Sequence, residues 1–367
     1  MRMRRLGALG LAGLLALSLA GCGGGGETSS QGSGSMPEEP SVSAIAPVEP
    51  EPEPEPEHPY AHPLTGEGMD EDISGQRPVA VMFNNLEKAL PQIGIGQADV
   101  VYEIVAEGGI TRLMGLFQDL EGAGDLGSIR SAREYYVNLA NGHDAIYIHA
   151  GGSPQAYDAL QGWGMNYIDF VNGPYDAMYW RDKERRKTAG FEHSLLTSSE
   201  RVLEQMPSRF RREHQEGFQL HWVFGSEAPA GGEPAGKLTV PFSTYKTGYF
   251  SYDQDSGRYL VSQTVNGHDH DLIDGGTGQE VSFANVLVLY TDISRIKGDE
   301  AGRLDVRTHG QGEGLLLRDG TLYPITWARD GRNDTYSFLD GQGEPIPLAV
   351  GSSYINIVGT DAAVVWE

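Results

Sequence analysis

Apolar and polar positions divide the chain into four stretches with different patterns. Apolar residues fill nearly all of positions 6–20, after three arginines near the amino terminus. This run has the length of the apolar part of a signal peptide and is shorter than the ~20 residues that a membrane-spanning helix needs. We therefore predict a signal peptide at residues 1–21.

The leader ends in Leu19-Ala20-Gly21-Cys22, which places small residues directly before a cysteine. This stretch resembles the lipobox of bacterial lipoproteins. The resemblance implies that the Cys22 thiol carries a fatty-acyl lipid such as palmitate and that Cys22 begins the mature chain. The alternative is an ordinary secretory signal that contains a cysteine by chance. Because Cys22 is the only cysteine, it has no disulfide partner in an exported chain, and we predict its lipidation.

Residues 22–62 contain no pattern that could bury a core. Glycines occupy positions 23–26, and proline alternates with glutamate from Pro50 to Glu57. Gly/Ser tracts form loose coils, whereas Pro-Glu repeats extend as polyproline II at ~3.1 Å per residue. The pattern predicts a disordered, lipid-anchored stalk over residues 22–62.

From residue 63 to 216, short apolar runs alternate with helix signals. The capping box Ser131-Ala132-Arg133-Glu134 and the pair Ser153-Pro154 each predict the start of a helix. Alternating strands and helices are typical of a layered α/β domain. The predicted strands are 78–83, 99–105, 111–117 and 144–149, and the predicted helices are 131–141, 153–160 and 197–206.

From residue 217 to 367 the helical periodicity disappears. Runs rich in β-branched and aromatic residues are separated by Asn266-Gly267, Asp319-Gly320 and Asp340-Gly341. Such pairs form hairpin turns because they adopt positive φ at low cost. The pattern predicts an antiparallel β domain, either a sandwich or a partly open barrel. The whole chain is therefore predicted to be α+β, with an N-terminal α/β layered domain followed by a β-rich C-terminal domain.

The charge of the chain narrows the classes of partner. There are 27 Lys and Arg residues against 51 Asp and Glu residues, which gives a formal net charge of −24. An acidic surface repels the phosphates that supply most nucleic-acid affinity, so we expect no nucleic-acid partner. It also argues against attachment to anionic lipid through a basic patch. The expected membrane contact is the lipid on Cys22.

The clearest candidate for a ligand site lies where a predicted strand ends at His149. Two glycines follow, and a helix N-terminus with free amides, which attract anions, comes next. Ligands of open α/β sheets bind at the carboxyl ends of the strands. Arginines at the start of the preceding helix would complete a bidentate clamp on carboxylate or phosphate. The candidate ligand-binding residues are Glu107, Arg112, Arg130, Arg133, His149, Gly151, Gly152 and Ser153.

A purely structural interpretation of the same residues stays open. In it the three arginines form ion pairs with Glu103, Glu107 and Glu134, and the glycines only make turns. The ligand-site hypothesis requires Arg112 and Arg130 to lie on the same side of the sheet as His149.

A second cluster, His268-Asp269-His270-Asp271, lies in the β half. The His-x-His spacing places two imidazoles on one side of a strand, as in some divalent-metal sites. The cluster directly follows Asn266-Gly267 and precedes Gly275-Gly276, which favours a solvated turn. We therefore predict no metal site and no cofactor, and His268, His270 and Asp271 are the candidates if a metal binds.

The sequence contains no familiar catalytic motif. It has no G-x-S-x-G elbow, no P-loop and no H-E-x-x-H. Acylation of Cys22 would also remove the only thiol. If the protein is an enzyme, His149 or His193 would act as general base.

Several longer motifs resemble the YerB-like family of bacterial lipoproteins, a two-domain family of uncharacterised function. The resemblance implies a lipid-anchored extracytoplasmic protein, chiefly of Gram-positive bacteria, and implies no particular activity. Where the family pattern is Pro-His-Asn, this chain has Glu192-His193-Ser194, which puts a shared role of His193 in doubt. The motifs that carry the resemblance are Asn84-Asn85, Pro91-Gln92, Ala98-Asp99, Tyr102-Glu103, Glu107 to Arg112, Arg130 to Arg133, His149 to Ser153, Gly267 to Asp271, Thr277-Gly278, Asn285-Val286 and Ile325 to Trp327.

Two classes of function follow. The first is a non-catalytic module, anchored on the outer face of the cell membrane, that binds a cell-envelope component, a peptide or a partner protein. The alternative is a hydrolase or transferase of envelope material that uses a histidine base and the arginine clamp. The scatter of polar motifs without a defined nucleophile favours the binding module.

Overall fold

A computed structural model of the chain describes residues 58–367. These residues belong to one compact unit, Glu55–Glu367. The predicted signal peptide, Cys22 and residues 22–57 of the predicted stalk lie outside the described residues. The described part begins with β1 (Tyr60–Ala61), which pairs with β2 (Gly68–Met69). Within residues 58–367, no helix combines the length and the hydropathy needed to cross a membrane.

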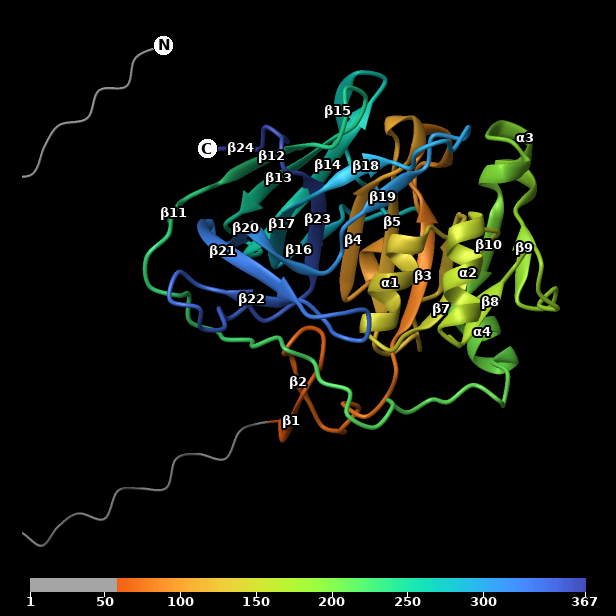
Figure 1. The fold of residues 1–367 in the computed structure, drawn as a ribbon, viewed down its shortest axis with the longest axis horizontal. Helices are drawn as coiled ribbons and strands as arrows, with labels where there is room; N and C mark the ends of the chain where they lie inside the picture. Colours follow the sequence, from red (N-terminus) through yellow and green to blue (C-terminus); the bar gives the residue numbers. More distant parts are fainter. Residues whose placement is uncertain (1–57) are drawn as a thin grey trace, which may run out of the picture. The chain divides into compact units, whose positions relative to one another are not determined.

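Strands from both halves of the chain form one mixed sheet of eleven strands (Figure 1). In order across the sheet they are β11 (Glu233–Pro234), β21 (Thr321–Arg329), β20 (Gly310–Arg318), β17 (Asn285–Thr291), β23 (Ser353–Gly359), β4 (Val100–Val105), β5 (Thr111–Phe117), β3 (Val79–Asn84), β7 (Ile146–His149) and β8 (Tyr167–Asp169), with β22 (Ser337–Leu339) beside β21. The two halves meet where β4 pairs in parallel with β23. The pairs β17–β23, β3–β7 and β7–β8 are also parallel, and the other pairs of this sheet are antiparallel.

Side chains alternate between the two faces of this sheet, as the period of a strand requires. Ala80 and Met82 point to the face that packs on α1 (Glu134–Gly142) and α2 (Pro154–Gly162), seen in yellow over β3 and β7 in Figure 1. We call this the helix-covered face. Val81 and Phe83 point to the opposite face, which packs on two smaller sheets and which we call the sheet-covered face.

The smaller sheets complete the fold, and none of the sheets within residues 58–367 closes on itself. The six-stranded sheet contains β15 (His268–Asp271), β14 (Arg258–Val265), β13 (Thr247–Asp253), β12 (Lys237–Pro241) and β24 (Val365–Trp366), with β16 (Ser282–Phe283) beside β14, and the three-stranded sheet contains β6 (Asp125–Gly127), β10 (Leu195–Ser198) and β9 (Tyr179–Arg181). The remaining elements are the pair β18 (Ile293–Arg295) and β19 (Leu304–Val306), the helices α3 (Lys183–Thr188) and α4 (Ser199–Gln205), and the 3₁₀ turns η1 (Glu87–Ala89), η2 (Ile95–Gln97), η3 (Glu107–Gly109) and η4 (Phe191–His193). The predicted α+β fold, layered first and then β-rich, is confirmed, although β17 and β23 add a parallel pair to the mainly antiparallel C-terminal half.

Two predicted hairpin turns have the expected backbone. Asn266-Gly267 joins β14 to β15, and Asp319-Gly320 joins β20 to β21, with positive φ at all four residues. Asp340-Gly341 instead opens a longer turn, in which the Asp340 amide donates to the Glu344 carbonyl at 2.8 Å. The predicted turn at residues 268–271 is the exposed strand β15, because its backbone continues the pairing with β14.

The two predicted caps have different outcomes. Ser153 caps α2, since its hydroxyl accepts from the Ala156 amide at 3.1 Å and Pro154 takes the first helical position. The predicted capping box at Ser131 is wrong, because α1 begins only at Glu134 and has no side-chain cap. Residues 131–133 run extended instead, because their backbone pairs with the loop that follows β7.

Candidate functional site

Several candidate residues gather at one edge of the main sheet. The strands β3, β4 and β7 end there, and β5 begins there with Arg112 opposite Asn84. Side chains two positions apart on a strand point to the same face of the sheet. Arg112 therefore shares the face of Met114, and His149 shares the face of Tyr147. Both belong to the helix-covered face. Arg112 and His149 therefore lie on the same side of the sheet, as the ligand-site hypothesis requires.

The backbone brings the segment 130–133 beside the loop after β7. The Ala150 amide donates to the Arg130 carbonyl at 3.1 Å, and the Ala132 amide donates to the Gly151 carbonyl at 2.9 Å. The Ser153 amide returns to the Ala132 carbonyl at 3.2 Å. Arg130 is thereby held at the same edge of the sheet as His149.

Two of the predicted anion-binding amides are already used within the chain. The Gly151 amide donates to the Asp169 carboxylate at 2.8 Å, and the Ser153 amide is taken by Ala132. Asp169 also accepts from the Val171 amide and from the Tyr157 hydroxyl, at 2.9 and 2.6 Å. The glycine loop is therefore closed by an internal carboxylate, and the arginines are the groups left to meet a ligand.

The three arginines differ in their partners. Arg133 forms a bidentate ion pair with Glu107, with Nε at 2.8 and 3.0 Å from the two carboxylate oxygens. Arg130 pairs with Glu192, whose side chain is 69% exposed, at 2.9 Å. The remaining guanidinium, that of Arg112, donates through Nη1 to the Ser131 carbonyl at 2.8 Å.

Arg112 carries the unbalanced charge of this site. Among the described residues no carboxylate lies within 4.0 Å of its guanidinium, which is 5% exposed. Its Nε is buried without a hydrogen-bond partner in the protein. Burial first, and then the charge of Arg133, lower the pKa of Arg112 to about 10, so it stays protonated near neutral pH. We call Arg112, Arg130, Arg133 and their acidic partners the arginine cluster.

His149 lies behind this cluster and is fully buried. Its Nδ1 donates to the Gly151 carbonyl at 2.8 Å, which leaves Nε2 as an acceptor without a partner. The ring of Tyr147, whose hydroxyl also lacks a partner, lies 5.4 Å away. Burial lowers the pKa of His149, opposed by the Asp169 carboxylate, so its imidazole is neutral near pH 7. A fully buried imidazole cannot reach a solvent-borne substrate in this conformation.

His193 is nearer the surface and is oriented by a residue that sequence reasoning gave no role. The Asn84 amide nitrogen, at the end of β3, lies 2.9 Å from Nδ1 of His193 and donates to it. Burial and the charge of Arg130 lower the pKa of His193, which favours the neutral imidazole. The Asn84-Asn85 motif was part of the family resemblance, but nothing in its spacing pointed to His193.

The residues considered for a metal give no site within the described part of the chain. His268, His270 and Asp271 are exposed on β15. Across residues 58–367, no three His, Cys, Asp or Glu side chains are grouped so that they could hold an ion together.

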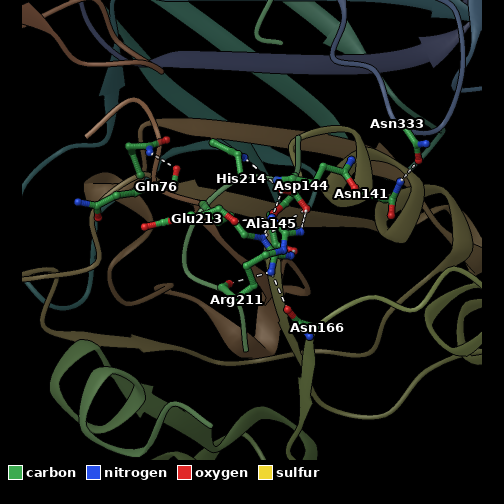
Figure 2. Close-up of polar contacts among 12 residues, drawn as sticks. Gln76, Asn141, Asp144, Ala145, Asn166, Arg211, Glu213, His214 and Asn333 are labelled. Carbon is green, nitrogen blue, oxygen red and sulfur yellow. Dashed lines mark hydrogen bonds and ion pairs between the residues drawn. The ribbon is translucent and has the colours of Figure 1, made fainter. Parts of the chain in front are cut away.

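Another charged cluster, absent from the sequence predictions, surrounds Asp144 at the start of β7 (Figure 2). Its carboxylate lies 3.3 Å from Arg77 Nε and 3.1 Å from Arg211 Nη2, and it accepts from His214 at 3.3 Å and from the Gln215 amide at 2.8 Å. These contacts, chiefly hydrogen bonds from His214 and Arg211, outweigh desolvation and lower the pKa of Asp144 to about 2. The cluster fastens the segment 211–215 to the main sheet, and we call it the Asp144 cluster.

Comparison with known proteins defines the class first. Residues 64–214 match the family described as "Protein of unknown function (DUF3048) N-terminal domain", and residues 238–355 match the corresponding C-terminal domain. The chain is 30% identical over 299 residues to "Putative lipoprotein YerB" of Bacillus subtilis (strain 168), covering 81% of this chain and 85% of that protein. A crystal structure of YerB protein from Bacillus subtilis superimposes with a TM-score of 0.69 at 27% identity, over 83% of this chain and 99% of the other.

These matches cover both halves of the described chain. The protein therefore belongs to the YerB-like family and contains both of its domains.

Proposed function

We propose that this protein is a lipid-anchored binding module on the outer face of the cell membrane, with an α/β domain at residues 63–216 and a β-rich domain at residues 217–367. Its ligand is an anionic group, carboxylate or phosphate, on a cell-envelope component, peptide or partner protein. The lipobox-like stretch ending at Cys22 supports the anchor, as does the relative described as "Putative lipoprotein YerB".

The observation that carries the binding proposal is the Arg112 guanidinium, which forms no ion pair among the described residues and whose Nε has no acceptor. A buried donor without an acceptor costs about 1–3 kcal/mol, and more when it is charged. An anion beside Arg112 and Arg130 would supply that acceptor through charge-assisted hydrogen bonds. The chain has a net charge of −24, so a local excess of arginine creates a patch of positive electrostatic potential that attracts a small anionic ligand to this site.

Replacement of Arg130 tests the clamp. Arg130→Ala should weaken the binding of acetate or inorganic phosphate by about 1.5–3 kcal/mol, the usual worth of a hydrogen bond to a charged group. Titration calorimetry on the full chain in detergent measures the affinities. Arg295→Ala, at an exposed arginine on β18, is the matched control and should bind like the wild type. Equal affinity in Arg130→Ala and wild type would remove Arg130 from the site.

The anchor has its own test. Cys22→Ala should abolish labelling of the protein by a clickable fatty acid, because the acylated thiol is gone. The variant should also keep its signal peptide, because the lipoprotein pathway leaves the precursor unprocessed, and its larger mass on a gel measures this. Labelling of the variant at the wild-type level would contradict the anchor.

The orientation of His193 supports a second candidate function, an envelope-acting hydrolase or transferase. A neutral imidazole whose Nδ1 accepts from Asn84 carries its proton on Nε2, so beside Arg130 it can donate a hydrogen bond to an anionic oxygen of a substrate. The general-base role requires the other tautomer, in which Nε2 is the free acceptor. His193→Ala would then reduce turnover of peptidoglycan fragments by ~10²–10⁴ with little change in their binding. A wild-type protein that binds these fragments and never cleaves them is a binding module alone.

A further inference from the structure

A second polar cluster lies at the same edge of the main sheet, on the sheet-covered face. It borders a cavity of about 330 Å³ between the η3 turn, the η1 segment and the six-stranded sheet. This volume lies in the range of small-molecule sites. The cavity is lined by Asn85, Leu86, Glu87, Gly109, Ile110, Thr244, Tyr245, Lys246, Thr264, Asn266 and Gly267.

The position of Lys246 in this cavity is fixed by a hairpin that docks on η3. The hydroxyl of Ser243 donates to the Gly109 carbonyl at 2.6 Å and accepts the Lys246 amide at 3.1 Å. Gly109 has φ +76°, and a Cβ there would lie 3.2 Å from the Ser243 hydroxyl, so glycine is needed for this approach. The turn between β12 and β13 thereby places Lys246 beneath the β4–β5 connection.

Lys246 is an unusual lysine because it is 6% exposed and has no ion-pair partner within 4.0 Å among the described residues. Its ammonium donates to the Gln263 side-chain oxygen. Lysine is almost never buried unless it is paired. Burial lowers the pKa of Lys246 to about 8, opposed by the charge of Glu103.

Glu103 does not serve as the missing partner, because its carboxylate is already bound by neutral donors. It accepts from Asn85 at 2.9 Å, from Thr111 at 2.5 Å and from Tyr354 at 2.6 Å. The side-chain amide of Asn85 donates to both Glu103 and Thr111. Lys246 is a residue of the cavity wall, and its ammonium, which donates only to Gln263 among the described residues, still has hydrogens for a ligand.

We propose that this cavity is a second ligand site, which binds a small organic monocarboxylate with the Lys246 ammonium as its counter-ion. One cation balances one carboxylate, whereas Glu87 at the cavity wall and Glu103 behind it disfavour a dianion such as phosphate. Leu86, Ile110 and the ring of Tyr245 offer apolar contacts to the rest of the ligand. The site uses none of the residues of the arginine cluster, so it stands independently of the function proposed above.

Butyrate and its neutral isostere butyramide are the probes, and ligand-observed NMR titration of the full chain in detergent is the measurement. Wild-type protein should bind butyrate about tenfold or more tightly than butyramide, as one charged hydrogen bond predicts. Lys246→Met should remove this preference, whereas Lys237→Met, at an exposed lysine on β12, should keep it. The same preference should persist in Arg130→Ala, in which the arginine cluster is disabled, and this comparison holds even if Lys246→Met fails to fold.

Three outcomes would overturn the proposal. They are no butyrate binding by the wild type, equal butyrate affinity in Lys246→Met and wild type, and tighter binding of inorganic phosphate than of butyrate to Arg130→Ala, in which the arginine cluster is disabled. Arg130→Ala separates the two sites, because butyrate binding in this cavity should survive that substitution. Loss of butyrate binding in Arg130→Ala alone would assign the carboxylate to the arginine cluster instead.

Discussion

The Asp144 cluster and the arginine cluster contain similar residues and use them in opposite ways. Around Asp144, the guanidinium of Arg77 also donates to the Asn166 side chain at 2.6 Å and to the Arg211 carbonyl at 2.9 Å. No buried side-chain nitrogen or oxygen of this cluster lacks a hydrogen-bond partner; the cluster consists of Arg77, Asp144, Arg211 and His214. In the arginine cluster, Arg112 keeps a buried Nε without an acceptor.

The difference shows how a structural ion cluster can be told from a candidate binding site. Removing one member of a saturated buried cluster leaves its partners unpaired, so the loss falls on stability. An unsaturated cluster holds charge that the fold does not use, so the loss should fall on ligand binding. The following predictions test that division.

The largest effect is expected at Asp144. Asp144→Asn keeps the size of the side chain and tolerates the positive φ of 49° at this position. It should lower the free energy of unfolding by about 3–5 kcal/mol, because Arg77 is left as a buried charge without its counter-ion. Urea unfolding measures the change, with Asp158→Asn on the exposed side of α2 as control. If the free energy of unfolding falls by less than about 1 kcal/mol, the Asp144 cluster contributes no more than an ordinary surface ion pair, which would contradict this prediction.

Arg112 should show the opposite behaviour. Arg112→Met replaces an unpaired buried cation by an apolar side chain of similar length, so the free energy of unfolding should change by no more than about 1 kcal/mol. The affinity for acetate or phosphate should fall by about 1.5–3 kcal/mol. A variant that loses stability and keeps its affinity would show that Arg112 is structural.

The smallest effect concerns the pH dependence of stability. The pKa of Asp144 is lowered to about 2 in the folded state, so its ionised form is favoured by folding. Its contribution is fully present above the ordinary value of about 4 and is lost as the pH falls toward 2. Urea unfolding between pH 5 and pH 2 should therefore give a smaller loss for Asp144→Asn than for wild type. Parallel pH profiles of the two proteins would contradict this assignment.

Local chemistry made much of the fold predictable. The strand runs at 78–83, 99–105 and 111–117 appear within a residue of their predicted bounds, because strands buried on both faces appear in the sequence as short, mainly apolar runs. The Ser153 cap and the turns after β14 and β20 depend only on neighbouring residues. The Ser131 capping box failed because a distant partner, the loop after β7, took the backbone of this segment.

The candidate site was less predictable because it depends on contacts between distant segments. The sequence located Arg112, Arg130 and His149, but not which carboxylates pair with which arginines. Glu103 on β4 and Lys246 in the turn between β12 and β13 lie far apart in the sequence, so no spacing could link them. The Asp144 cluster joins positions 77, 144 and 211 for the same reason.

The pairing of β23 with β4 has a consequence for how the chain reaches its native state. It joins positions more than two hundred residues apart, such as Val100 and Ser353, and β23 also separates β4 from β17. Until β23 is available, β4 has an unpaired hydrogen-bonding edge whose side chains are buried in the native fold. The pairing of β4 therefore has to wait until β23 has been synthesised, and we expect a chain cut before β23 to offer that edge to other chains and to aggregate.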